Sequence, residues 1–171
     1  RDYERFMTEG AFMPDEVKVY PCALIEGSRL VGCYERGEWR PYTEEELLDV
    51  LAEHNVQGLS IANLQKDRTG LEIPRDWEGG LSGGPCTVAS EERIAQVYRE
   101  YGERFAIAGI GGVFTPQQAY RKIRNGASLV MFISSLMYRG PQQITVLKRG
   151  LAELLRRDGF EHVSEAVGID A

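Results

Sequence analysis

Short apolar runs alternate with amphipathic stretches along most of the chain. Four runs are rich in β-branched or other apolar residues, as is typical of strands: residues 17–25, 57–62, 105–110 and 129–133. Apolar residues recur at helical spacing in four further stretches: residues 43–54, 90–101, 115–126 and 144–159. This alternation predicts an α/β fold of about four βα units, with a parallel sheet and right-handed crossovers. A parallel half-barrel and a doubly wound sheet both fit the pattern.

Residues that favour helix starts stand at the beginning of three of these stretches. Thr43 followed by Glu46, and Thr115 followed by Gln118, have the spacing of capping boxes. Ser90 is a residue type that caps helices through its side-chain oxygen. We therefore expect three helices to begin at these positions.

Two long stretches are expected to be connections. Residues 26–42 and 63–88 are rich in glycine, and the second includes four glycines within residues 79–85. Such a loop is either a plain flexible connection or backbone that lies flat against a planar ligand, where a Cβ would clash. Asn63, at the end of a predicted strand, is either a turn residue or an amide that binds a polar substrate.

Glycines and hydroxyls follow two consecutive predicted strands. Residues 109–112 hold three glycines, and residues 133–135 end in two serines. Backbone N–H groups at such strand ends bind phosphate in parallel barrels, although the same glycines would also serve in tight turns. Phe114 stands where the dinucleotide-binding fingerprint needs its last glycine, which argues against a Rossmann site.

Length and composition favour one globular domain that is shorter than a whole barrel. The chain has 171 residues, of which 43% are hydrophobic and 27% charged. Complete parallel barrels usually need about 250 residues, so we expect a TIM-barrel-like half-barrel. The net charge of −6 argues against a nucleic-acid partner. We find no apolar run long enough to span a bilayer and no signal segment, and we expect a cytoplasmic protein.

Cysteine and histidine offer little for metal or nucleophilic chemistry. Cys22, Cys33 and Cys86 are widely spaced and lack the close pairs of zinc or iron–sulfur sites. His54 and His162 lie in polar stretches, where we expect solvated or capping side chains. We therefore predict no metal site and no histidine-dependent catalysis.

Several longer motifs resemble the C-terminal half of dihydroorotate dehydrogenase, the flavin enzyme of pyrimidine synthesis. The resemblance covers residues 47–171, and the closing segment is closer to the membrane-associated, quinone-using class than to the soluble fumarate class. The motifs, in the family's order and spacing, are GLSIANL (58–64), GGLSGGP (79–85), IAGIGGVFTPQQAYRKIRNGASLV (107–130), YRGP (138–141), LKRGLAELLRRDGF (147–160) and SEAVGID (164–170).

This resemblance implies an FMN site built from three loops. Backbone N–H groups after one strand would hold the flavin phosphate together with the end of the next strand, and the glycine-rich loop would lie along the flavin. The residues carried over are Gly111, Gly112, Ile133 and Ser134 for the phosphate, and Ser82 and Gly83 for the flavin.

The resemblance also implies contacts from two earlier strands. Asn63 would hydrogen-bond the substrate, although Ala62 replaces the hydroxyl residue that usually precedes this asparagine. Lys18 lies in a V-K-V-Y-P strand, whose form in the family carries a lysine that stabilises negative charge near flavin N1. An ordinary strand-edge lysine is the alternative, because Lys18 and Asn63 are further apart than the family leads us to expect.

The reaction implied by the resemblance is the oxidation of dihydroorotate to orotate through FMN, with a quinone as electron acceptor. The catalytic base of the family lies in its N-terminal half, and no residue of this chain matches it by motif. We therefore assign no catalytic residue, and we expect the isolated chain to bind flavin weakly and to turn over little substrate.

Residues 2–46 resemble a different family, the elongator catalytic subunit, which modifies the wobble uridine of tRNA by radical-SAM chemistry. The motifs are PDEVKVYPCALIEG (14–27) and YERGEWRPYTEEE (34–46). The cluster-binding cysteines of that family lie upstream of the matching stretch, so we do not expect radical chemistry. The two resemblances predict one structural domain made of an elongator-like segment, 1–46, and a dehydrogenase-like segment, 47–171.

Two alternatives to the flavin enzyme are an elongator-type tRNA-modifying protein and a non-catalytic chimeric or designed half-barrel scaffold. In each case, four parallel strands would leave both sheet edges and an apolar face uncovered. We therefore expect a homodimer or an unstable monomer.

Overall fold

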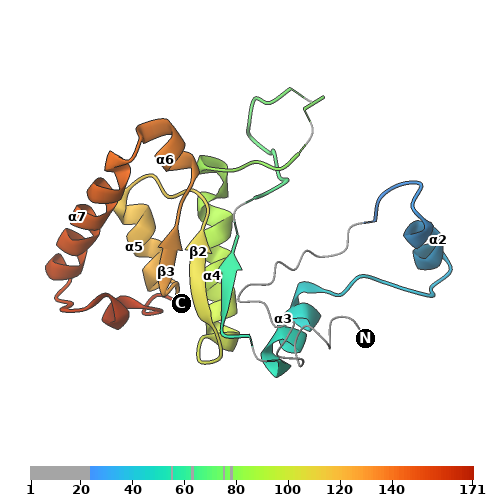
Figure 1. Cartoon of the computed structure of the whole chain (residues 1–171), viewed down its shortest axis with the longest axis horizontal. Coiled ribbons are helices and arrows are strands. Elements are labelled where there is room, and N and C mark those ends of the chain that lie inside the picture. Colours follow the sequence, from blue (N-terminus) through green and yellow to red (C-terminus); the bar gives the residue numbers. More distant parts are fainter. Residues whose placement is uncertain (1–23, 55, 63, 75, 78) are drawn as a thin grey trace, which may run out of the picture. The chain divides into compact units, whose positions relative to one another are not determined.

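The structure, a computed structural model, describes residues 24–54, 56–62, 64–74, 76–77 and 79–171. The chain forms two compact units, residues 1–56 and 57–171 (Figure 1). The predicted strand at residues 17–25, with Lys18, lies outside the described residues, and so does Asn63.

The first unit contains a helix that the sequence predicts and one that it does not. Thr43 and Glu46 form the predicted capping box of α3 (Glu44–Glu53), with N–H to oxygen distances of 3.1 and 2.9 Å. By contrast, α2 (Arg29–Glu35) lies in a stretch expected to be a connection. Its length of 7 residues, with Gly32 inside it, is too short to show a helical period. The segment boundary predicted at residues 46–47 stays a prediction.

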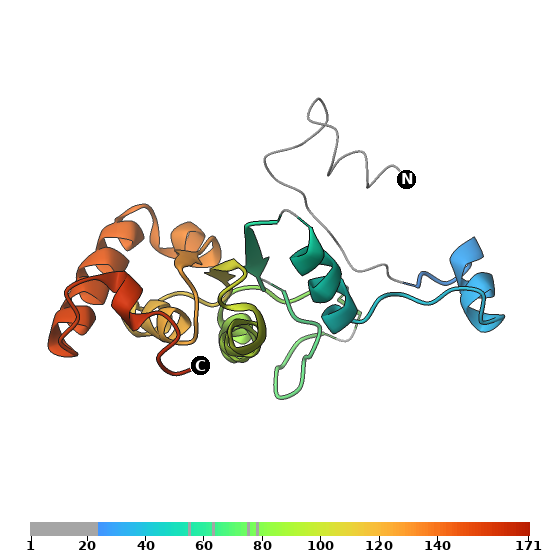
Figure 2. The ribbon, with the colours of Figure 1, turned by 90° about the horizontal axis from the view of Figure 1, so that it is seen from below.

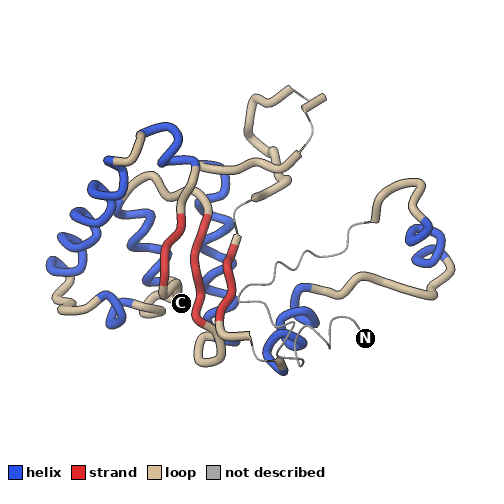
Figure 3. The backbone as a smooth tube through the Cα atoms, viewed as in Figure 1, coloured by secondary structure: helices blue, strands red, loops and turns tan. Residues whose placement is uncertain are grey.

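The second unit is built on a parallel sheet whose described strands follow the order β1-β2-β3 (Figure 3). In the central strand, Gly109 pairs with Ile61 on one side and with Val130 on the other. Each strand therefore lies beside its neighbour in the chain, as in half of a parallel barrel, and the predicted α/β, TIM-barrel-like fold is confirmed. The strands are β1 (Gly58–Ile61), β2 (Ala106–Ile110) and β3 (Leu129–Met131).

Helices cover one face of this sheet. α4 contacts β1 and β2, α5 contacts β3, and α7 packs against α5; Figure 2 views α4 almost along its axis, with α5 beside it. Apolar side chains fill the space between the layers, and Ile94 and Ile107 are completely buried there. The helices are α4 (Thr87–Tyr101), α5 (Pro116–Arg124), which begins with the predicted Thr115–Gln118 capping box, and α7 (Gln142–Arg157).

Gly109 marks the closest approach of the sheet to the helices. A Cβ at this position would lie 2.8 Å from Ile94 Cδ1 and 3.0 Å from Ala127 Cβ, and the aliphatic stem of Lys122 follows at 3.5 Å. A side chain here would push the buried side chains of Ile94 and Ala127 away, so glycine suits this close packing of β2 against the helices.

No helix of the second unit's described residues covers the opposite face of the sheet. Ser60, Leu129 and Met131 share this face, and Ser60 Oγ lies 3.9 Å from Met131 Sδ. Leu129 is 61% exposed and Met131 41% exposed. This is the uncovered apolar face that the half-barrel predicts.

In the second unit, the sequence misplaces one helix start, misses the short turn that precedes it, and misses two elements further along the chain. The 3-10 turn η1 (Gly84–Cys86) leads into α4, which begins at Thr87, so Ser90 lies inside the helix and does not cap it. Ser90 is 1% exposed, because its face of the helix is packed against the end of the sheet. The missed elements are α6 (Ser134–Arg139) and η2 (Val163–Ala166).

Candidate functional site

Three loops that the sequence singles out separately meet at one end of the sheet. A Cβ on Gly83, in the glycine-rich loop, would lie 3.3 Å from Ser134 Cβ and 3.7 Å from Phe114 Cζ. Ser134 follows β3, and Phe114 follows the glycines after β2. The glycine-rich loop therefore contacts the segment that follows β2 and the segment that follows β3. Ile133 and Ser82 border this site and are exposed.

Gly111 and Gly112 form a tight turn directly after β2. Both have positive φ angles, +106° and +66°, which strain any residue with a side chain. A Cβ on Gly111 would press on the Ala62 carbonyl oxygen, and one on Gly112 would collide with Thr87. The turn therefore needs glycine at both positions for conformation and for space.

Two hydroxyls from the first turn of α4 hold the carbonyls of this glycine turn. Thr87 Oγ1 lies 3.0 Å from the Gly112 oxygen, and Ser90 Oγ lies 3.2 Å from the Gly111 oxygen. The hydroxyls also lie 2.8 Å from the Gly84 oxygen and 3.0 Å from the Thr87 oxygen, respectively. Each hydroxyl has a single proton, which it shares between the two carbonyl oxygens near it. Both glycine carbonyls thus face α4, and the backbone N–H groups are the part of the turn that can bind an anion.

Lys122 lies beneath the same turn. Its side chain, on α5, is completely buried, and its ammonium donates a hydrogen bond to Ser90 Oγ. Burial lowers the pKa of Lys122 to about 8, against an opposing effect of Glu91. Sequence reasoning missed this residue, because a lysine in a charged helix is normally solvated. The available signal was its position on the apolar side of α5, three residues after Ala119 and one before Ile123.

The loop between β1 and α4 is closed by specific hydrogen bonds. Gln65 and Leu81 exchange backbone hydrogen bonds of 3.0 and 2.7 Å, and Arg68 donates to the carbonyls of Trp77 and Gly79 at 2.5 and 3.0 Å. This bonding argues against the plain flexible connection that the glycines also allow.

Cys86 and Ser135 are buried next to the site. Cys86 Sγ lies 3.0 Å from the Leu81 oxygen, and burial raises the pKa of its thiol, so we expect an unreactive side chain. Ser135 is 1% exposed, and its hydroxyl lacks a hydrogen-bond partner within the described structure. A buried hydroxyl without a partner fits a place where a polar ligand completes the bonding.

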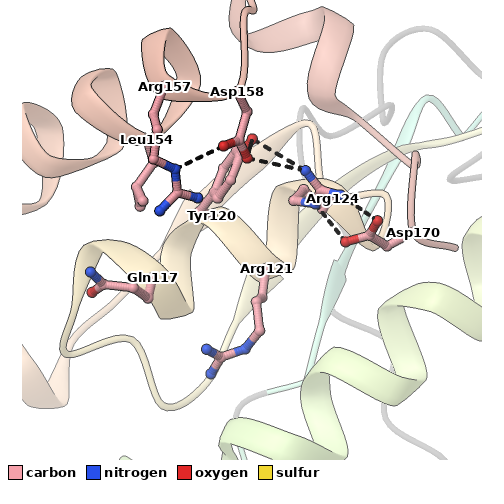
Figure 4. Close-up of a pocket in the computed structure, with 8 residues that line it drawn as sticks. All are labelled: Gln117, Tyr120, Arg121, Arg124, Leu154, Arg157, Asp158 and Asp170. Carbon is pink, nitrogen blue, oxygen red and sulfur yellow. Dashed lines mark hydrogen bonds and ion pairs between the residues drawn. The ribbon is translucent and has the colours of Figure 1, made fainter.

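A separate shallow pocket of about 400 Å³ lies on the outer surface, between α5 and α7 (Figure 4). Arg124 bonds both oxygens of Asp170 at 2.5 and 2.6 Å, while Arg157 lies 2.8 Å from Asp158. Tyr120 donates to Asp158 at 2.8 Å. Because these arginines face carboxylates, the pKa values of Asp158 and Asp170 are lowered and the charges are balanced. The pocket is therefore a structural ion-pair cluster.

The described residues show neither a metal-ligating cluster nor a membrane-spanning helix. No group of three or more histidine, cysteine or acidic side chains among them is placed to hold a metal ion. No helix among them is long and apolar enough to cross a bilayer.

Comparison with known proteins gives one consistent result. The family model for dihydroorotate dehydrogenase matches residues 40–155. A quinone-type dihydroorotate dehydrogenase from Deinococcus deserti is 46% identical over 68% of this chain and 32% of the relative, and one from Synechocystis is 37% identical over 72% and 35%. The chain thus spans about a third of the length of these relatives.

Solved structures agree with the sequence relatives. The ligand-free dihydroorotate dehydrogenase of Eimeria tenella matches with a TM-score of 0.69 and 32% identity, over 75% of this chain and 37% of that one. The same enzyme in complex with ferulenol matches with a TM-score of 0.68 and 34% identity, over 75% and 35%. The resemblance of residues 2–46 to the elongator catalytic subunit finds no support in these comparisons.

Proposed function

The chain belongs to the dihydroorotate dehydrogenase family, and on this premise we propose that it is the part of a quinone-type dihydroorotate dehydrogenase that binds the phosphate of FMN. The whole reaction would be the oxidation of dihydroorotate to orotate, with a quinone as electron acceptor, in the cytoplasm. The observation that carries the proposal is the meeting of Gly83, Ser134 and the Gly111–Gly112 turn at one end of the sheet.

The residues at this site fit a flavin phosphate. The glycine turn adopts a conformation open only to glycine, its carbonyls accept hydrogen bonds from Thr87 and Ser90, and Ser135 supplies a buried hydroxyl without a partner among the described residues. Phosphate groups bind where several backbone N–H groups converge, as glycine turns at strand ends allow. Bound FMN would supply the acceptor for the hydride of the substrate.

Each residue of the site has a distinct role in the proposal. Gly111 and Gly112 bind the phosphate through backbone N–H groups, and Ile133 and Ser134 complete this contact from the next strand. Backbone at residues 82–83 lies along the flavin. The substrate contact of Asn63 and the flavin contact of Lys18 stay predictions, as both residues lie outside the described structure. We assign no catalytic residue within this chain.

Titration of the 171-residue chain with FMN tests the proposal. We expect flavin fluorescence to be quenched on binding, and we expect Gly112→Ala to weaken FMN binding by at least about tenfold, because its Cβ collides with Thr87. Gly70→Ala is the matched control: Gly70 has a similar φ of +77°, but a Cβ there meets nothing within 4 Å. If the unchanged chain does not bind FMN, or if both variants bind equally well, the proposed phosphate site is wrong.

A further inference from the structure

Buried polar side chains concentrate around the glycine turn. Thr87 and Ser90 hold the carbonyls of the turn, and Gln143 Nε2 donates to the carbonyl of Phe114, 2.8 Å away, just beyond it. Lys122 is the only charged side chain in the buried class among the described residues. These buried polar side chains therefore gather around one loop, residues 111–114, which follows β2.

Lys122 connects to the turn through a single atom. Its ammonium donates to Ser90 Oγ, and the same oxygen lies 3.2 Å from the Gly111 carbonyl oxygen. Because the lysine occupies a lone pair of the hydroxyl oxygen, the single hydroxyl proton is directed to the backbone, where the Gly111 carbonyl oxygen shares it with the Thr87 carbonyl oxygen, 3.0 Å from Ser90 Oγ. The aliphatic stem of the lysine is fully buried and runs past the backbone of Gly109, which has no side chain in its way.

The buried ammonium is costly to the fold. Charged and titratable groups face it from three elements: Glu91 on α4, Arg121 on α5 and Cys86 on η1. Glu91 pairs with Arg121 at 3.0 Å, so its charge is shared. An apolar side chain of similar size would fill this space with a smaller desolvation cost. A buried charge kept at such a cost, directly below a turn that binds anions, indicates a role in binding.

We propose that Lys122 is a positioning residue for the flavin phosphate. Through Ser90 it orients the Gly111 carbonyl and thereby the N–H groups of the turn. Its buried positive charge also favours the binding of a dianion on the other side of the turn. This inference rests on the proposed function. It adds to that function a selectivity for phosphorylated over unphosphorylated flavin. In a region of low dielectric, a buried charge acts on a dianion over several ångströms.

The test compares FMN with riboflavin, which lacks the phosphate, on the 171-residue chain. Lys122→Met should weaken FMN binding by at least about tenfold, the scale of a hydrogen bond to a charged group, and leave riboflavin binding within about twofold. Ser90→Ala should weaken FMN binding in the same selective way. Lys148→Met, at an exposed position of α7, is the control and should bind both flavins like the unchanged chain.

Stability and pH separate this role from a structural one. The free energy of unfolding of Lys122→Met should not fall, since a charge is removed from the core, so lost FMN affinity would not reflect unfolding. In the unchanged chain, the preference for FMN should decline as pH rises above about 8, where Lys122 loses its charge. The phosphate stays a dianion in this range, and the Cys86 thiol, whose pKa burial raises from 9.0, titrates at higher pH.

The outcomes distinguish the inference from the function on which it rests. A chain that binds neither flavin overturns both. A chain that binds FMN, with Lys122→Met and Ser90→Ala variants that keep the same preference for FMN over riboflavin, overturns the role of Lys122 and leaves the phosphate site intact. A preference for FMN that does not change between pH 7 and 9 also contradicts the inference.

Discussion

At the scale of single residues, the site depends on pairs in which one member holds the other in place. Thr87 leaves no room for a side chain at Gly112, and its hydroxyl holds the carbonyl of the same glycine. The hydroxyl of Ser90 likewise donates to the carbonyl of Gly111. The conformation of the turn is therefore set by α4 before any ligand arrives, which lowers the entropic cost of binding.

The ionisation of Lys122 predicts an unusual dependence of stability on pH. Its pKa is lowered to about 8 in the folded chain, against about 10.4 for a lysine in an unfolded one. Between these values the unfolded chain binds more protons, so this residue makes the free energy of unfolding rise with pH, at up to about 1.4 kcal/mol per unit. Below pH 8 both states are charged and the contribution is constant.

Urea unfolding of the unchanged chain and of Lys122→Met, measured from pH 7 to 10, checks this. The difference between the two isolates the lysine from Cys86, whose raised thiol pKa acts with the opposite sign in the upper part of the range. Parallel curves for the two proteins would mean that Lys122 ionises as an ordinary surface lysine does.

The sequence predicts the ligand-facing residues of the site better than the residues that support them. Gly111, Gly112 and Ser134 stand out because they follow two consecutive predicted strands, Gly83 stands out because it lies in a dense run of glycines, and the family resemblance assigns their roles. Their mutual contact depends on tertiary packing, which no local pattern contains. Lys122 and the interior position of Ser90 were missed for the same reason, since both support a turn that lies at least ten residues away from them in sequence.

At the scale of elements, α5 is held at both of its ends. The Thr115–Gln118 capping box fixes its start, and the C-terminal segment fixes its end through backbone bonds from Gly168 to Ile123 and from Asp170 to Arg124, 3.1 and 2.9 Å long. Arg124 adds its two bonds to the carboxylate of Asp170. Because α5 carries Lys122, this anchoring also holds the lysine beneath the glycine turn.

Removing the carboxylate of Asp170 tests this anchor. Asp170→Asn should lower the free energy of unfolding by about 1 kcal/mol at neutral pH, a modest value because the pair is partly exposed. The pKa of Asp170 is lowered in the folded chain, so its contribution is present above the unfolded value of about 3.9 and is lost as pH falls through the folded one.

The difference between Asp170→Asn and the unchanged chain should therefore shrink in acid, as measured by thermal unfolding at pH 7 and at pH 2. Asp76→Asn, at an exposed loop position, is the control and should match the unchanged chain at neutral pH. A difference for Asp170→Asn that persists undiminished at pH 2 would assign its effect to packing and not to charge.

Helix and strand positions were largely predictable, and the exceptions share a cause. The long amphipathic helices and the three described strands lie close to their predicted positions, because burial of one face imposes a period that the sequence shows. The short α2 and α6, with 7 and 6 residues, contain too few turns for such a period. Their formation depends on local turns and tertiary contacts.

At the scale of the whole molecule, the open face of the sheet leads us to expect association. Leu129 and Met131 expose apolar surface on the short strand β3, and such a face is normally covered. We expect the 171-residue chain to form homodimers, as seen by light scattering coupled to size-exclusion chromatography.

A charge on this face should reduce the association. Leu129→Glu is expected to shift the chain towards monomers, whereas Val88→Glu, at a position of matching exposure on α4, should leave the mass unchanged. A folded monomer for the unchanged chain, or equal effects of both substitutions, would show that this face does not bind a second copy.

Gly109 limits which descendants of this sequence can exist. Any other amino acid at this position adds a Cβ where Ile94 and Ala127 leave no space. A missense change at Gly109 is therefore expected to lower stability, and it should be accepted more readily once residues on α4 or next to α5 have become smaller. The close packing of β2 against its helices thus influences the order in which mutations at these positions can be accepted.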